Sequence, residues 1–133
     1  MSSSAILSGV GHHLEADRST IISGEMNRVI GDDSVILSGD HQTVLGDESV
    51  ILSGSNNQVL ANGAVVAGRN ARAKHDGSFI FSTLDRPVST QRENQFVVAA
   101  NRICRCGKSA CRCGKSICRC GNLMCRCGQS ILS

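Results

Sequence analysis

Large aromatic side chains are scarce in this chain of 133 residues, which has no Trp, no Tyr and only three Phe. Compact globular domains usually fill their centre with aromatic bulk. Hydrophobic residues still make up 41% of the chain, and most of them are Val, Ile, Leu and Ala. This composition favours a thin, repetitive core. The lack of Trp and Tyr also removes the usual stacking platforms for bases, so we expect no nucleic-acid partner.

Several sequence signals of other protein classes are absent. No apolar run approaches the roughly 20 residues that span a bilayer, so we expect no membrane insertion. The N-terminus has no basic region followed by an apolar stretch, which predicts synthesis in the cytosol without a signal peptide. The chain also has no nucleophile elbow, phosphate loop, zinc-protease helix or paired-carboxylate motif. We therefore predict that it is not an enzyme and has no catalytic residues.

Acidic side chains are missing from one end of the chain. Residues 101–133 carry seven basic and no acidic side chains, whereas residues 1–100 carry seven basic and eleven acidic ones. The bland interpretation is that each charge solvates its own surface. The sharper one is attraction between oppositely charged ends, which predicts head-to-tail association of subunits.

A repeat of 15 residues dominates the first half of the chain. Ser34-Val35-Ile36-Leu37-Ser38-Gly39 recurs as Ser49-Val50-Ile51-Leu52-Ser53-Gly54, and similar copies begin at Ser4 and Ser19. A second apolar pair follows in each repeat, as in Val44-Leu45. Each repeat reads as strand, turn, strand, turn, which predicts an all-β parallel solenoid whose stacked coils bury a shared core.

Alternation along the first strand of each repeat separates two apolar rows. We assign one row, together with the mid-repeat valines, to the core of the roll. We assign the isoleucine row to the opposite face, where a regular apolar stripe predicts an interface between subunits. The predicted core residues are Val35, Leu37, Val44, Val50, Leu52 and Val59, and the predicted trimer interface residues are Ile21, Ile36 and Ile51.

These Ser-Val-Ile-Leu-Ser-Gly repeats resemble the head repeats of trimeric autotransporter adhesins and of phage tail-fibre and appendage proteins. The resemblance implies a left-handed β-roll in which three rolls pack about a threefold axis, so the partner is the chain itself as a homotrimer. The segment from Asn70 to Phe81 is similar to the segment that closes such rolls. It implies a roll over residues 1–77, closing strands over 78–101 and a tail over 102–133.

The tail contains all eight cysteines in a seven-residue Cys-x-Cys-Gly repeat. Alternation places both cysteines of each pair on one face of a strand and the arginine on the other. The repeat resembles the triple-stranded β-helix of phage puncturing needles, which implies a cysteine-lined β-helix or β-prism. The candidate residues are Cys104, Cys106, Cys111, Cys113, Cys118, Cys120, Cys125 and Cys127.

Three interpretations of these cysteines stay open. They form disulfides between chains, or they bind Zn²⁺, Cu(I) or an iron–sulfur cluster, or they remain thiols in an apolar core. Disulfides need an oxidising setting, which a cytosolic protein meets once its cell has lysed. We therefore expect a spore surface, a virion or another extracellular location, and we commit to no metal or cofactor.

Taken together, these patterns predict a structural subunit of a disulfide-stabilised extracellular fibre, of the spore-appendage or phage-fibre type. One alternative is an adhesin or tail-tip module that contacts a receptor on a host surface. Another alternative is a metal-binding cysteine tail.

Overall fold

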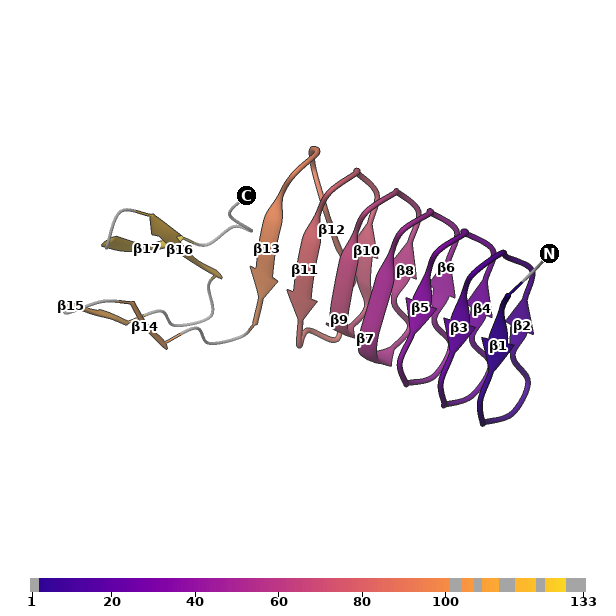
Figure 1. Ribbon diagram of the computed structural model, residues 1–133. Coiled ribbons are helices and arrows are strands. Elements are labelled where there is room, and N and C mark those ends of the chain that lie inside the picture. Colours follow the sequence, from indigo (N-terminus) through magenta and orange to yellow (C-terminus); the bar gives the residue numbers. More distant parts are fainter. Residues whose placement is uncertain (1–2, 101–103, 107–108, 113–116, 122–123, 129–133) are drawn as a thin grey trace.

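The computed structural model describes residues 3–100 and the backbone of four strands in the tail. Residues 3–100 form a parallel β-solenoid in which successive coils stack along one axis (Figure 1). The seven-stranded sheet, called the front sheet below, has the order β1-β3-β5-β7-β9-β11-β13. The six-stranded back sheet has the order β12-β10-β8-β6-β4-β2. The predicted all-β parallel solenoid is confirmed.

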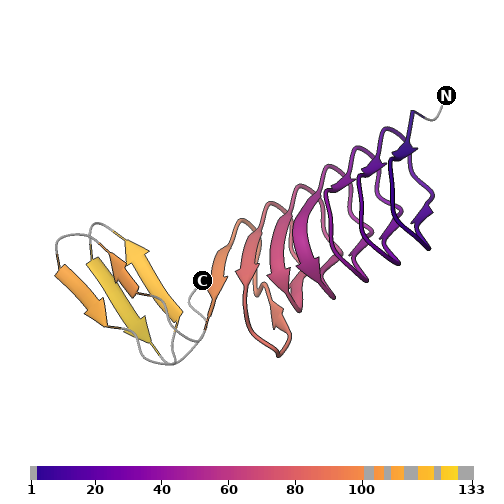
Figure 2. The ribbon, with the colours of Figure 1, turned by 90° about the horizontal axis from the view of Figure 1, so that it is seen from below.

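The strands are short, because each coil turns after a few residues. The front strands are β1 (Ala5–Ile6), β3 (Thr20–Ile21), β5 (Val35–Ile36), β7 (Val50–Ser55), β9 (Val65–Arg69), β11 (Phe79–Ser82) and β13 (Phe96–Ala99). The back strands are β2 (His13–Leu14), β4 (Arg28–Val29), β6 (Thr43–Val44), β8 (Gln58–Val59), β10 (Ala71–Ala73) and β12 (Val88–Ser89). Figure 2 shows the same stack of coils seen from below.

The pairing register follows the sequence repeat. Val35 pairs with Val50, and Val50 pairs with Val65, at steps of 15 residues. The next step, from Val65 to Phe79, is 14 residues, and the step from Phe79 to Phe96 is 17. The strands of residues 79–99 therefore continue both sheets, and variation in coil length is absorbed in the turns.

The core lies between the two sheets and consists of aliphatic side chains. Ile21, Ile36 and Ile51 of the front sheet are fully buried, as are Val44 and Val59 of the back sheet. The predicted assignment of Ile21, Ile36 and Ile51 to an outward interface row is therefore wrong. Val44 and Val59 occupy the core as expected.

The four residues Val35, Leu37, Val50 and Leu52, predicted as core, face outward instead. Val35 and Val50 are half-buried, while Leu37 and Leu52 are exposed. The serine that opens each repeat explains the reversal. Ser34 is buried and donates its hydroxyl to the Gly46 carbonyl at 3.0 Å inside the roll. Alternation from an inward Ser34 puts Ile36 inside and both Val35 and Leu37 outside.

Glycines stand where the coils approach one another most closely. A Cβ atom built at Gly31 would overlap the carbonyl of Gly46 in the next coil, and one at Gly46 would overlap that of Ala61. Neither residue has a positive φ, so close approach alone requires glycine there.

The tail strands are β14 (Cys104–Cys106), β15 (Ser109–Arg112), β16 (Ile117–Gly121) and β17 (Met124–Gly128). Strand β14 pairs antiparallel with β15, and β16 pairs antiparallel with β17. The predicted cysteine lining of the tail depends on side chains that lie outside the described residues. For Cys113 the backbone lies outside them as well.

Candidate interaction surface

Ladders of side-chain hydrogen bonds fix the coils in register. Ser19 donates to the carbonyl of Gly31 at 3.0 Å and accepts the Ser34 N–H at 3.0 Å. The same pattern repeats one coil further on, where the Ser34 hydroxyl accepts the Ser49 N–H at 3.1 Å. Each buried hydroxyl thus satisfies backbone groups of two coils, which gives the outward side chains a rigid base.

A second ladder runs inside the opposite turn and consists of carboxamides. Asn27 Oδ1 accepts the Gln42 N–H at 3.0 Å, Gln42 Oε1 accepts the Asn57 N–H at 3.1 Å, and Asn57 Oδ1 accepts the Ala71 N–H at 3.0 Å. These residues recur at 15-residue steps in the sequence. A polar residue repeated ahead of each mid-repeat strand is the sequence signal of this ladder, which the expectations above did not include.

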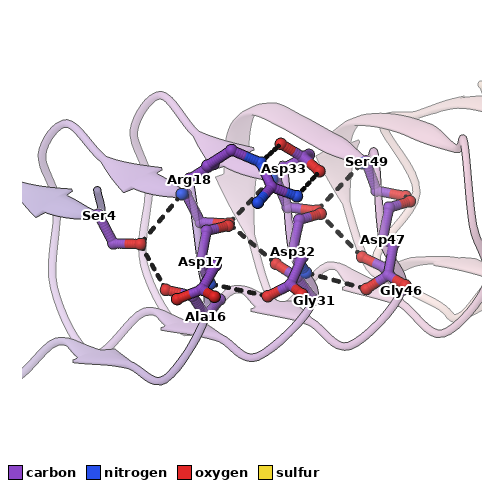
Figure 3. A network of polar contacts seen from close by, with 12 residues as sticks. Ser4, Ala16, Asp17, Arg18, Gly31, Asp32, Asp33, Gly46, Asp47 and Ser49 are labelled. Carbon is purple, nitrogen blue, oxygen red and sulfur yellow. Dashed lines mark hydrogen bonds and ion pairs between the residues drawn. The ribbon is translucent and has the colours of Figure 1, made fainter. Parts of the chain in front are cut away.

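A third ladder lies on the surface, along an acidic turn (Figure 3). The backbone N–H of Asp17 donates to Asp32 Oδ1 at 2.7 Å, and that of Asp32 donates to Asp47 Oδ1 at 2.9 Å. These carboxylates therefore bind backbone. Within the described residues, no group of three or more His, Cys, Asp or Glu side chains is arranged to hold a metal ion.

One ion pair connects neighbouring coils beside this ladder. Arg18 Nε and Nη2 bind Asp33 Oδ1 and Oδ2, each at 2.6 Å (Figure 3). The hydrogen bond from Arg18 holds the pKa of Asp33 below its ordinary value, and the same contact raises the pKa of Arg18. Both groups are exposed to solvent, so this pair contributes little to stability.

The outward side of the front sheet, called the front face below, is almost wholly apolar. From β3 onward, each front strand has an outward position on either side of a buried one, although the second of these on β9, Ala67, is itself buried. Phe79 and Phe96 stack with their ring centroids 5.0 Å apart. Leu37 and Leu52 are 38% and 42% exposed, and Phe96 is 64% exposed. One row of the front face consists of Ala5, Thr20, Val35, Val50, Val65, Phe79 and Phe96, and the other consists of Leu7, Ile22, Leu37, Leu52, the buried Ala67, Phe81 and Val98.

The outward side of the back sheet has a different composition. One outward row consists of His13, Arg28, Thr43, Gln58, Arg72 and Ser89. The neighbouring row contains Glu15, Ile30, Leu45, Leu60 and Lys74, so its middle is apolar. The two outer faces of the roll therefore differ sharply, and only the front face presents adjacent apolar rows.

The sequence-predicted site residues are thus redistributed. The predicted core residues Val35, Leu37, Val50 and Leu52 lie together on the front face, and the predicted interface isoleucines lie behind them in the core. The eight cysteine side chains lie outside the described residues. Hydrophobicity alone did not distinguish the two rows, because both are apolar.

The solenoid architecture corresponds to that of a known protein family. The family model of the grass antifreeze β roll matches residues 2–98. The chain belongs to this grass antifreeze β roll family. The match covers the coils of the solenoid and stops short of the cysteine tail. No curated protein and no solved structure matches the chain.

The match to the grass antifreeze β roll supports a β-roll repeat fold and a structural domain. The narrower resemblance to autotransporter heads and phage fibres stays an expectation. In the described part of the chain, no helix is long and apolar enough to cross a membrane.

Proposed function

We propose that the chain is a non-enzymatic structural subunit that assembles as a homotrimer through the front face. In this proposal the trimers build a disulfide-stabilised extracellular fibre or appendage, of the spore-appendage or phage-fibre type. The observation that supports it is the pair of apolar rows on the outside of the front sheet.

An apolar surface of this regularity favours a binding role. Monomeric soluble proteins rarely expose large contiguous apolar patches, and such patches commonly mark interfaces. Val50, Val65 and Phe79 pair on the consecutive parallel strands β7, β9 and β11, and Leu37, Leu52 and Phe81 stand in the adjacent row. In that row the buried Ala67 separates Leu52 from Phe81. Burying apolar area contributes about 25 cal/mol per Å². A symmetric assembly covers this face on every copy with a single kind of contact.

The proposal is tested by placing charge on the front face. The variant Leu37→Asp with Leu52→Asp keeps the core intact, because both side chains are exposed. The matched control is Thr43→Asp with Gln58→Asp, on the back sheet of neighbouring coils. Sedimentation in the presence of reductant is expected to give trimers for the wild type and the control. The front-face variant is expected to be a monomer with the same circular dichroism spectrum.

The outcomes separate clearly. A front-face variant that remains a trimer overturns the interface. A wild-type chain that is monomeric at micromolar concentration overturns the trimer itself.

Ice binding is a second candidate function, supported by the match to the grass antifreeze β roll. Parallel coils space the side chains of the front face at about 4.8 Å along the solenoid axis, which gives a flat and regular array. Recrystallisation of ice in the presence of purified protein tests this candidate. Inhibition by the wild type, lost in the Leu37→Asp with Leu52→Asp variant and kept in the back-sheet control, would assign the front face to ice.

A further inference from the structure

The N-terminal end of the roll leaves part of its core uncovered. Among the described strands, β1 pairs only with β3 and β2 pairs only with β4. Ile6 occupies the same stack as Ile21 and Ile36, but it is 46% exposed whereas they are fully buried. Within the described residues, the first coil presents an edge strand and an exposed apolar position.

A shallow hollow of about 690 Å³ lies at this end. Ile6 and Leu14 contribute its apolar lining, and Glu15, Asp17 and Asp32 contribute carboxylates. The end of the roll therefore combines an unpaired strand edge, apolar surface and negative charge.

Charge is graded along the whole chain. Residues 3–48 carry eight acidic and two basic side chains, residues 49–100 carry three acidic and five basic ones, and residues 101–133 carry seven basic ones only. Strands β14–β17 are drawn beyond β13, at the opposite end from β1 (Figure 1). The negative and positive ends of the molecule are thus the two ends of the roll axis.

We infer that the N-terminal end of the roll is a docking surface for the cysteine-repeat segment, residues 104–128, of a second copy. One strand of this segment adds to β1, so that subunits associate head to tail. This inference rests on the proposed function, because it supplies the longitudinal contact of the fibre.

The chemistry of the segment matches that of the hollow. Its Cys-Arg-Cys strands alternate small apolar residues with cations. A strand laid against β1 satisfies the free edge with backbone hydrogen bonds, which is the mode of β-augmentation. The added strand covers the open end of the stack above Ile6, and the positive charge of the segment lies near the acidic end of the roll that contains Glu15 and Asp17.

The first experiment compares two leucine-sized side chains of similar exposure. Ile6→Lys places a cation at the docking end, and Leu45→Lys, at a position 42% exposed on the back sheet, is the matched control. Sedimentation of the full chain in reductant, over a range of concentrations, is expected to show species larger than a trimer for the wild type and for Leu45→Lys. Ile6→Lys is expected to remain a trimer and to weaken end-to-end association at least tenfold.

The second experiment exchanges charges between the two ends. One variant carries Glu15→Lys with Asp17→Lys, and the other carries Arg112→Glu with Arg119→Glu. Each variant alone is expected to stop at the trimer. A mixture of the two is expected to elongate, because each variant then meets an end of opposite charge.

The results that overturn the inference differ from those that overturn the proposed function. Wild-type trimers that never elongate overturn the inference and leave lateral assembly standing. A mixture that fails to elongate shows that another surface, such as a second N-terminal end, occupies the hollow. Absence of the trimer overturns the proposed function instead.

Discussion

At the scale of single residues, close approach between coils makes Gly31 irreplaceable. A methyl group at Gly31 would overlap the backbone carbonyl of Gly46, which cannot move without shifting a whole coil. We expect Gly31→Ala to lower the free energy of unfolding by about 3 kcal/mol or more, as severe overpacking does. Urea unfolding followed by circular dichroism measures the effect.

Gly63→Ala is the control for this substitution. Gly63 has a φ of +60°, but its nearest neighbour to an added Cβ, the Gly77 nitrogen, is 4.0 Å away. Only the cost of a left-handed backbone applies there, about 1 kcal/mol. Equal destabilisation by the two variants would show that coil spacing does not constrain Gly31.

We expect the hydrogen bonds of the Gln42 carboxamide to contribute more to the stability of the fold than the volume of the side chain does. It accepts the Asn57 N–H and donates to the Gly54 carbonyl at 2.9 Å. Gln42→Leu leaves the Asn57 N–H buried without that partner, at a cost of about 1–3 kcal/mol. Gln42→Asn should cost less than about 1 kcal/mol, because asparagine makes the same contacts at positions 27 and 57. Thermal unfolding of both variants checks this order, and a Leu variant as stable as the Asn variant would contradict the ladder.

The sequence did not predict which of the two apolar rows of the front sheet faces the core. The repeat gave the strands and the solenoid, because a 15-residue period of apolar pairs has few other solutions. The inward or outward parity of Ile36 against Leu37 did not follow, since both rows are apolar. Parity was set by the buried hydroxyl of Ser34, which binds the Gly46 carbonyl 12 residues ahead in the same coil. That contact exists only once the coil has closed on itself.

At the scale of elements, the Arg18–Asp33 pair joins the coil of β3 to the coil of β5. Because this contact lowers the pKa of Asp33, it stabilises the fold above the ordinary carboxyl pKa and is lost as pH falls through the lowered value. We expect wild type to exceed Asp33→Asn in melting temperature at neutral pH and low salt. The difference should fall away as the pH is lowered from the ordinary carboxyl pKa through the lowered value, and it should shrink in about 1 M salt, where screening extends over about 3 Å.

Melting temperatures measured between pH 2 and 7 test this coupling. Arg18→Gln is a matched variant, because it removes the cation and keeps the carboxylate. A stability difference between wild type and Asp33→Asn that does not decrease at all as the pH is lowered would show that the carboxylate charge is not its cause. The effect should be small in any case, since exposed ion pairs are weak.

At the scale of the whole molecule, the roll and the cysteine tail have different roles. The roll of residues 3–100 contains no cysteine, and all eight cysteines lie between residues 104 and 127. Stability of the roll therefore comes from its core and its ladders. In the proposed fibre, covalent assembly comes from the tail. The sequence showed this division through composition, and pairing of the thiols could not follow from it, since connectivity depends on how chains meet.

The tail cysteines are expected to join different chains. Cysteines two apart on one strand point the same way and lie about 6.5–7 Å apart, so bonding within a Cys-x-Cys pair is strained. Under threefold symmetry each layer supplies three thiols, an odd number, so complete pairing requires two layers. Pairing Cys104 of one chain with Cys106 of the next satisfies every thiol and keeps the symmetry. Non-reducing gels of native material, with free thiols blocked, should show a trimer or a larger ladder that collapses to 14.0 kDa in reductant.

Circular dichroism supplies the control for this redox change. Reductant should leave the β signal of the cysteine-free roll intact, because no disulfide constrains residues 3–100. Replacing Cys104 and Cys106 by Ser should reduce the intensity of the cross-linked gel bands in proportion to the thiols removed. Ser3→Ala, outside the tail, should leave these bands unchanged. A single monomer band without reductant would refute bonding between chains. Metal that remains with that monomer after desalting would then assign the thiols to a metal site, and its absence would assign them to an apolar core.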